Sequence, residues 1–256
     1  MGEFPFLWRK LRILDSERTR HTCMSAPGDF DSTASAEFEA ARRDMVARQI
    51  GERGIRSARV LDAMRTVPRH LFVPREHVRA AYLDEPLAIG EGQTISQPFM
   101  VAAMSAALSL VGNESVLEVG AGSGYQAAVL SLLAREVIGI ESRPALANSA
   151  RERLARLGFA NVQIEQGDGS LGWEAGAPFD AIVVAAAAPA VPPPLVDQLA
   201  EGGRLVIPVG RLEHQNLLRI VKIAGRTTEE HLFSCRFVLL RGRYGWAHDK
   251  LEFNRT

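Results

Sequence analysis

From residue 115 onward, short apolar runs alternate with segments of helical periodicity. The runs have the length and β-branched content of buried strands, and they cover residues 116–119, 135–141, 161–165, 179–185 and 203–209. After the second run, Leu146, Ala150 and Leu154 recur at helical spacing until Gly158. Strands that alternate with helices form mostly parallel, doubly wound sheets. The pattern therefore predicts an α/β fold.

The two ends of the chain depart from this alternation. Residues 216–223 and 231–240 read as two strands joined by a Gly-containing turn, which predicts an antiparallel edge. Residues 37–83 have a helical pattern. Residues 1–36 match nothing that follows and end in a stretch rich in Gly, Asp, Ser and Thr. We expect an N-terminal extension at 1–36, without a secretory signal and with Met24 as an alternative start, and one folded domain at 37–256.

Residues 116–125, Val-Leu-Glu-Val-Gly-Ala-Gly-Ser-Gly-Tyr, are the most informative stretch. Glycines at alternate positions let the backbone turn sharply out of a strand and approach a ligand closely. The dinucleotide fingerprint G-x-G-x-x-G fits poorly, because Tyr125 stands where its third glycine would be. The spacing, with Glu118 just before it, is similar to the first motif of S-adenosylmethionine (SAM) methyltransferases, in which this acid lies near the ammonium end of SAM. A plain structural turn is the alternative.

Two further acids follow predicted strands. Glu141 ends the second strand about twenty residues after the glycine loop, where a carboxylate can accept both hydroxyls of a ribose. Asp168 lies between two glycines directly after the third strand. Taken singly, the first is more often a solvated residue and the second a turn residue. Three acidic strand ends in series favour an adenosine site.

Residues 90–100 join a Gly-rich loop to a predicted helix and contain Thr94 and Ser96. Because these two hydroxyl residues alternate, they face the same way if the segment is extended. A cap on the helix near Pro98, from Ser96 or Gln97, is the simpler interpretation of the local pattern. It leaves the string Gly-Gln-Thr-Ile-Ser-Gln-Pro unexplained.

Composition narrows the classes of function. Lys+Arg and Asp+Glu both number 30, so no basic surplus indicates nucleic acid as a partner. The two cysteines, Cys23 and Cys235, lie far apart, which suits a reducing, cytoplasmic compartment. The six histidines lack metal-ligand spacing, so we expect no metal. The most apolar run, 181–196, is broken by prolines, so we expect no membrane span, and the balanced charge permits a monomer.

Together these motifs make the chain resemble the protein-L-isoaspartate O-methyltransferases. The resemblance covers about residues 43–246, and the Thr-Ile-Ser-Gln-Pro string at 94–98 separates this family from other SAM methyltransferases. The further motifs that carry it are Val67-Pro68-Arg69, Pro86-Leu87, Gly167-Asp168-Gly169 with Gly172-Trp173, Pro178-Phe179-Asp180 and Pro208-Val209-Gly210. It implies a mostly parallel, seven-stranded, Rossmann-like methyltransferase sheet with added N-terminal helices. Leu239 departs from the pattern, since the family usually has proline there.

The resemblance also implies roles for individual residues. Ser96 would be the active-site hydroxyl, and Thr94 would lie with it beside the cofactor. Glu141 would take the ribose of SAM, and Asp168 with Gly169 would flank its adenine. The remaining positions implied are Gly120, Gly122 and Gly124 along SAM, and Ile207, Pro208 and Val209 at the substrate backbone.

The implied activity is transfer of a methyl group from SAM to the free α-carboxylate of L-isoaspartyl residues in damaged proteins and peptides. Such a carboxyl has a pKa of about 3.3–3.7 and is ionised at neutral pH, so no general base is needed. The absence of His or Lys from the key motifs agrees with this chemistry. Two alternatives stay open at this point. One is a SAM methyltransferase of another small carboxylate or amine, and the other is a non-catalytic SAM-binding module.

Overall fold

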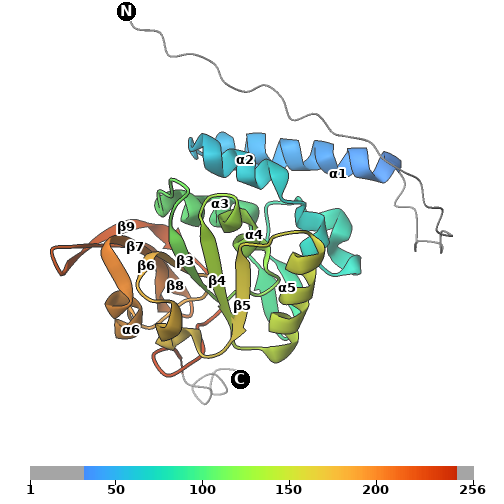
Figure 1. Cartoon of the computed structure of the whole chain (residues 1–256). Helices are drawn as coiled ribbons and strands as arrows, with labels where there is room; N and C mark the ends of the chain where they lie inside the picture. The colour runs from blue at the N-terminus through green and yellow to red at the C-terminus, as the bar shows by residue number, and fades with distance from the viewer. Residues whose placement is uncertain (1–31, 247–256) are drawn as a thin grey trace, which may run out of the picture.

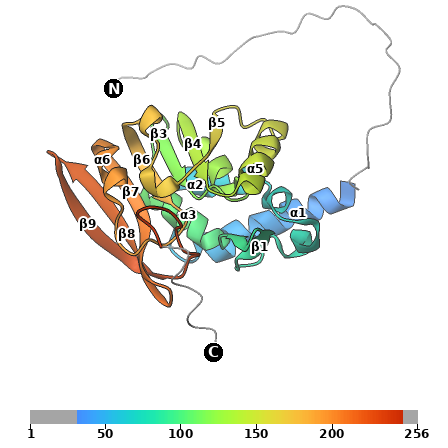
Figure 2. The same ribbon diagram turned by 90° about the horizontal axis from the view of Figure 1, so that it is seen from below.

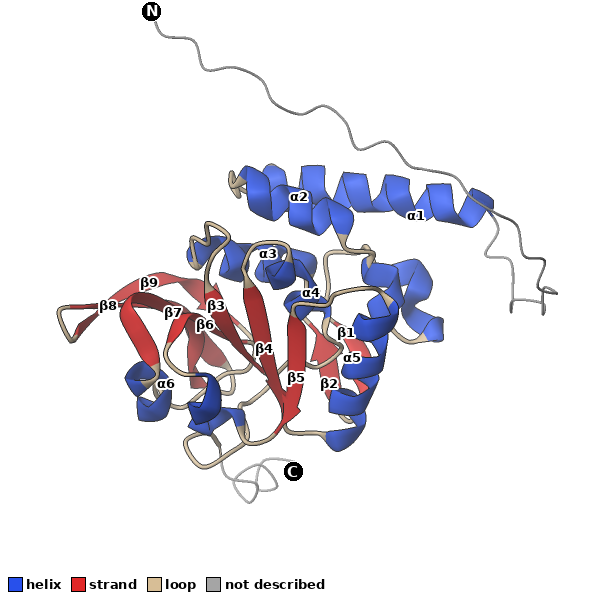
Figure 3. Cartoon of the chain, in the orientation of Figure 1, coloured by secondary structure: helices blue, strands red, loops and turns tan. Residues whose placement is uncertain are grey.

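A seven-stranded sheet forms the centre of the protein. The structure, a computed structural model, describes residues 32–246. Figures 1 and 3 show the sheet with helices on both faces. The strand order is β5-β4-β3-β6-β7-β8-β9. The strands are β3 (Ser115–Val119), β4 (Glu136–Glu141), β5 (Val162–Gln166), β6 (Phe179–Val184), β7 (Leu199–Arg211), β8 (His214–Ile223) and β9 (Arg226–Cys235).

The first five strands in this order are parallel, and the last two are antiparallel. The predicted doubly wound α/β fold and its antiparallel edge are therefore confirmed. Figure 2 shows β9 at one edge of the sheet and α5 (Pro144–Arg156) close to β5 at the other. The chain leaves β3 toward β4 and returns on its other side as β6, so the order of the strands reverses at β3. Parallel sheets bind ligands at the carboxyl ends of the strands beside such a reversal.

Alternation along the central strands produces two apolar cores. In β3, Val116 belongs to one buried cluster and Leu117 to the other, and Ala181 and Ile182 of β6 divide in the same way. Successive side chains of a strand point to opposite faces, so a continuous apolar run fills both. The first core lies under the larger set of helices, α2 (Ala58–Thr66), α3 (Pro98–Ala107), α4 (Tyr125–Ser131) and α5. The second packs against the short α6 (Pro193–Asp197).

The N-terminal helices pack on the first core through an apolar face. Helix α1 (Ser32–Asp44) continues into a π-helical turn, η1 (Met45–Gly51), and Met45, Val46 and Ile50 are fully buried. The short 3₁₀ turns η2 (Arg69–Phe72) and η3 (Arg75–Ala80) lead to the hairpin of β1 (Leu87–Gly90) and β2 (Gln93–Ile95). Two more 3₁₀ turns, η4 (Gly169–Leu171) and η5 (Glu174–Gly176), precede β6. The division into an extension at 1–36 and a domain at 37–256 stays a prediction, because residues 1–31 and Met24 lie outside the described residues.

The last strand differs from the prediction in its bounds. The sequence pattern placed it at residues 231–240, whereas β9 ends at Cys235. The buried Gln215 side chain accepts from the backbone N–H of Phe237 at 2.7 Å and donates to its carbonyl at 3.3 Å. These bonds replace the strand ladder. They turn residues 237–240 away from β8 and toward the end of β6, where Leu239 bridges Ala187.

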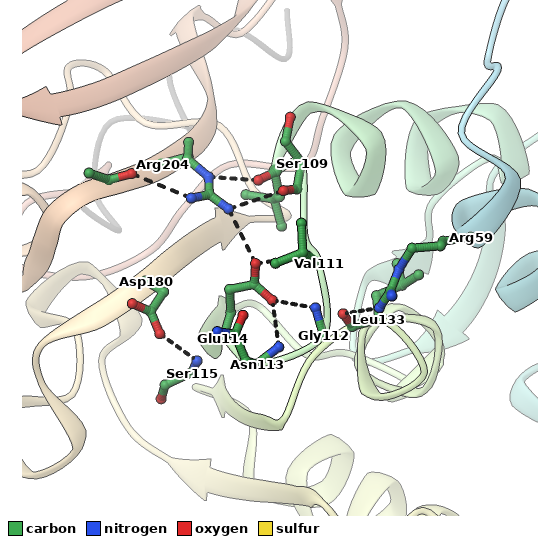
Figure 4. Close-up of polar contacts among 12 residues, drawn as sticks. Arg59, Ser109, Val111, Gly112, Asn113, Glu114, Ser115, Leu133, Asp180 and Arg204 are labelled. Carbon is green, nitrogen blue, oxygen red and sulfur yellow. Dashed lines mark hydrogen bonds and ion pairs between the residues drawn. The ribbon is translucent and has the colours of Figure 1, made fainter. Parts of the chain in front are cut away.

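At the amino end of β3, the buried Glu114 holds the loop that enters the sheet (Figure 4). Its carboxylate accepts from the backbone N–H groups of Val111 and Gly112, both at 2.8 Å, and of Asn113 at 3.1 Å. Arg204 of β7 lies 3.6 Å from the same carboxylate and donates to the Leu108 carbonyl at 2.8 Å. Burial alone would raise the pKa of Glu114, but these N–H groups and the Arg204 charge outweigh it and lower the pKa.

We expect Glu114→Ala to lower the free energy of unfolding by about 3 kcal/mol at pH 7, because it leaves several N–H groups and Arg204 without their acceptor. A carboxyl whose pKa is lowered by folding stabilises the protein above its unfolded pKa of about 4.3, and the stabilisation is lost as pH falls through the folded pKa. The deficit of the variant should therefore shrink below about pH 4. Urea unfolding of the parent and of Glu114→Ala at several pH values measures this difference in the free energy of unfolding.

The control is Glu136→Ala, which removes an exposed carboxylate 2.6 Å from Arg135. An exposed ion pair contributes about 0–1 kcal/mol, so this variant should unfold nearly as the parent does. Equal losses in the two variants would contradict the role given to Glu114.

Candidate active site

The glycine loop follows β3 and opens α4. Gly120, Gly122 and Gly124 have φ of 88°, 54° and 83°, the left-handed region that glycine adopts without strain. The N–H groups of Gly120 and Ala121 both donate to the Ile140 carbonyl of β4, at 2.8 and 3.1 Å. The loop is therefore fixed to the neighbouring strand, as a preformed ligand site requires.

Gly124 serves packing behind the loop. A Cβ at this position would lie 3.1 Å from Leu154 and 3.4 Å from Ala150, both on α5. On the same helix, Arg153 donates to the Ser123 carbonyl at 2.8 Å. Helix α5 thus holds the loop from behind, while Gly120 and Gly122 face the cavity in front.

This cavity opens to solvent at the carboxyl ends of β3, β4 and β6. It lies beside the reversal of strand order, where the fold predicts a ligand. Elements far apart in the sequence contribute to it: β2, the glycine loop, the end of β4 and the segment after β9. Its lining includes Thr94, Ser96, Glu118, Gly120, Gly122, Gln126, Glu141, Gly169, Ala185, Val238, Leu239 and Arg241.

Glu118 is a buried carboxylate in this cavity with no partner. Its side chain is 1% exposed, and neither oxygen has a hydrogen-bond partner among the described residues. Burial, and secondarily the charge of Glu141, raise the pKa of Glu118 well above its usual value. The side-chain nitrogen of Gln126 is also buried and without a partner. Because buried polar groups are normally paired, these atoms indicate a cationic, hydrogen-bonding ligand.

Glu141 is held in place by the loops on either side of it. One of its oxygens accepts from the Gly122 N–H at 2.9 Å, and the other from the Arg143 N–H at 2.9 Å. The Ser142 hydroxyl donates to the second oxygen at 3.3 Å and does not cap α5. An ionised carboxylate has about four acceptor sites, which leaves capacity for ligand hydroxyls.

Asp168 lies beside the cavity and fixes the segment that follows β9. One oxygen accepts from the Ser170 N–H and hydroxyl at 2.9 and 2.6 Å, and the other from the Arg243 N–H at 2.7 Å. The next residue, Gly169, lines the cavity, and a Cβ there would lie 2.5 Å from Val119. The acid therefore joins β5 to the C-terminal segment that forms one wall.

Leu239 forms part of this wall. The hydrogen bonds that attach the segment to Ala187 use the Val238 carbonyl and the Leu240 N–H, both at 2.8 Å. Neither uses the N–H of Leu239. A proline at this position would keep the same bonds, so the departure from the family pattern leaves the attachment intact.

Ser96 lies where this cavity meets a second one. Thr94, Ala185 and Val238 border both cavities as well. Helix α3 begins at Pro98 without a side-chain cap, and the described residues offer the Ser96 hydroxyl no hydrogen-bond partner. The helix-cap interpretation of Ser96 is therefore wrong for this structure.

Ile207, Pro208 and Val209 lie in β7, outside the linings of both cavities. Ile207 is fully buried in the second core, and the Pro208 carbonyl accepts from the Ala188 N–H at 3.0 Å. They support the strand beside the cavity wall. Ala185 and Val238, which border both cavities, were missed from the sequence. Ligands bind at the carboxyl ends of parallel strands, and this strand-end rule singled out Glu141 in the sequence. Ala185 follows β6, so the same rule could have found it.

Within residues 32–246, no cluster of His, Cys, Asp and Glu could hold a metal ion. In the same part of the chain, no helix combines the length and the apolar character that crossing a bilayer requires.

Two solved structures share the fold. A chain described as a protein-L-isoaspartate O-methyltransferase from Plasmodium falciparum, in complex with S-adenosyl-L-homocysteine, is 29% identical with a TM-score of 0.68. The alignment covers 78% of this chain and 98% of that one. Another protein-L-isoaspartate O-methyltransferase is 28% identical with a TM-score of 0.73, over 79% of this chain and 67% of that one.

Sequence relatives are closer. The protein-L-isoaspartate O-methyltransferase of Methanoculleus marisnigri is 53% identical over 205 residues, which cover 80% of this chain and 93% of that protein. Protein-L-isoaspartate O-methyltransferase 2 of Geotalea uraniireducens is 55% identical over 211 residues, covering 82% and 97%. The sequence profile of the protein-L-isoaspartate(D-aspartate) O-methyltransferases (PCMT) matches residues 40–245. With the glycine loop and the two adjoining cavities, these matches mean that the chain belongs to the protein-L-isoaspartate(D-aspartate) O-methyltransferase family.

Proposed function

We propose that this protein transfers a methyl group from SAM to the free α-carboxylate of L-isoaspartyl residues in damaged proteins and peptides. The observation that carries the proposal is the unpartnered, buried carboxylate of Glu118 in a cavity that meets a second cavity at Ser96. One cavity suits a cationic donor, and the other suits a peptide. Family membership supports the same activity.

The residues of the first cavity fit SAM. Its ammonium and sulfonium charges would compensate the buried charge of Glu118. Its ribose hydroxyls would donate to the acceptor sites of Glu141 that remain free. Gly120 and Gly122 leave room for a ligand close to the backbone. Gly169, which lines the cavity next to Asp168, would lie against the adenine.

When bound, SAM supplies a methyl group on a sulfonium sulfur, which keeps the bonding electron pair as the acceptor oxygen takes the methyl. Ser96 holds the acceptor carboxylate at the junction of the cavities through its free hydroxyl, without adding a charge that would over-stabilise the starting state. The buried Ile95 and Val101 keep water from this junction. Exclusion of water favours a reaction that neutralises opposite charges.

No residue has to remove a proton, because the α-carboxyl is already ionised at neutral pH. The task of the protein is then mainly alignment, which is worth about 7–11 kcal/mol in well-oriented reactions. In the ester product the backbone nitrogen of the next residue displaces methanol and closes a succinimide, and hydrolysis of that ring gives partly normal aspartate and so begins repair.

The test measures transfer of tritiated methyl groups from SAM to a peptide with one isoaspartate and to its aspartyl twin. We expect labelling of the first and none of the second. Equal labelling of both, or labelling only of free small carboxylates or amines, would reject isoaspartate specificity and favour a methyltransferase of another substrate. Binding of SAM without transfer to any of these acceptors would indicate a non-catalytic binding module.

Asp168→Ala is expected to weaken SAM binding about tenfold, because it releases the Arg243 N–H and loosens the wall formed by Leu239 and Arg241. Calorimetry measures the dissociation constant, and limited proteolysis after Arg241 or Arg243 measures the loosening. The matched control is Asp62→Ala, whose exposed carboxylate pairs with Arg65 on α2. An unchanged dissociation constant in Asp168→Ala would remove Asp168 from the site.

The compartment and the oligomeric state belong to the same proposal. We assign the reaction to the cytoplasm and to a monomer. Cys235 is a free thiol whose pKa burial raises to about 11, so it stays protonated and resists oxidation at neutral pH. Cell fractionation and light scattering of the purified chain test the two assignments.

A further inference from the structure

The second cavity has an unbalanced charge. Its lining contains two arginines, Arg53 and Arg236, and no carboxylate. The chain as a whole has 30 cationic and 30 acidic residues, so the positive charge is a local property of this cavity. The rest of the lining is neutral, with large apolar side chains such as Phe99 and Phe233.

The two arginines differ in what holds them. Arg53 lies 2.7 Å from an Asp84 carboxylate oxygen, and its guanidinium lies 3.6 Å from the centre of the Phe99 ring. Its charge is thus already compensated. Arg236 is exposed, and no described residue forms an ion pair or hydrogen bond with its side chain. The uncompensated charge of the cavity is therefore that of Arg236.

The backbone on both sides of Arg236 is fixed. Cys235 pairs with Gln215 in the β8–β9 ladder, and the Gln215 side chain holds the N–H and carbonyl of Phe237. Gln215 itself is fully buried. A long side chain with a free charge therefore stands on a rigid support at the cavity that meets Ser96.

We propose that Arg236 makes the enzyme prefer isoaspartyl residues that have an aspartate or glutamate within two residues in the sequence. This inference rests on the proposed function and adds a substrate class to it. A second carboxylate beside the target would find in Arg236 a partner that the protein itself does not supply. Since both groups keep contact with water, the pairing should be worth about fivefold in kcat/KM and should weaken with salt.

The experiment uses isoaspartyl peptides that differ at one neighbouring position, with glutamate, glutamine or lysine there, on either side of the target. For the parent enzyme we expect kcat/KM to fall about fivefold from the glutamate peptide to the glutamine peptide, and further for the lysine peptide. The difference between the peptides should lie in KM. Arg236→Gln should make the three peptides nearly equal, and Arg236→Glu should reverse their order. Raising the salt from 0.05 to 0.5 M should flatten the preference of the parent.

The control variant is Arg226→Gln, which removes an exposed arginine at the first residue of β9, the strand that Arg236 follows, away from the cavity lining. It should keep the preference of the parent. The SAM dissociation constant and the thermal midpoint should be unchanged in every variant.

Two results would overturn the inference. The first is a parent enzyme that treats the three peptides alike. The second is an Arg236→Gln variant that loses activity equally on all three, since Arg236 would then hold the target carboxylate itself. Methylation of the glutamine peptide by the parent tests the proposed function separately, so the two can fail independently.

Discussion

Ser96→Ala is expected to lower kcat about 100-fold while the dissociation constant of SAM changes less than twofold. The hydroxyl lies at the junction of the two cavities, and no described group uses it. Its removal leaves the acceptor carboxylate free to rotate away from the methyl group. Single-turnover kinetics with an isoaspartyl peptide, together with calorimetry for SAM, separates the two effects.

Two further substitutions make this prediction specific. Ser96→Thr keeps the hydroxyl and should retain more activity than the alanine variant. Ser105→Ala removes a buried, unpartnered hydroxyl from the last turn of α3, outside both cavities, and should leave kcat nearly unchanged. If Ser96→Ala turned over at the parental rate, Ser96 would have no part in catalysis.

Glu118→Gln should weaken binding of SAM and of S-adenosylhomocysteine about 10- to 100-fold, because both have an ammonium group that needs a buried counter-charge. The same substitution should stabilise the ligand-free protein by about 1–3 kcal/mol at pH 7, since it replaces an unpaired buried carboxylate by a neutral amide. A substitution that weakens SAM binding but stabilises the ligand-free protein indicates a buried charge whose partner is the ligand. Calorimetry and urea unfolding measure the two.

The pH dependence of the stability difference between Glu118→Gln and the parent provides a second test. Folding raises the pKa of Glu118, mainly through burial, so its contribution to stability is fully present below the unfolded pKa of about 4.3 and is lost as pH rises through the folded pKa. The advantage of Glu118→Gln without ligand should therefore be largest at neutral pH and vanish near pH 4. A variant that bound SAM normally, or that was destabilised at pH 7, would show that Glu118 already has its partner in the free protein.

The strand-end rule located much of the candidate site from local sequence. Glu118, Glu141 and Gly169 all line the cavity, because the carboxyl ends of parallel strands meet at one edge of the sheet, and their roles toward SAM stay predictions. The rule did not reveal that both carboxylate oxygens of Asp168 accept hydrogen bonds within the protein, from Ser170 and Arg243. The bond from Arg243 depends on a segment 75 residues further along the chain, which no local pattern encodes, whereas the bonds from Ser170 are local and fit the turn interpretation of Asp168.

The sequence by itself determined the layered fold, the glycine loop and the hydroxyl pair at Thr94 and Ser96, because these follow from short-range periodicity and from backbone conformations that only certain residues adopt. The tertiary structure alone decided which walls surround the loop. It buried Ile207 instead of exposing it to substrate, turned the chain after Cys235, and brought Val238 and Arg236 into the lining of the same cavity as Ser96. Such placements depend on packing between distant segments. Many weak contacts contribute to this packing, and no single residue in the sequence indicates which arrangement is most stable.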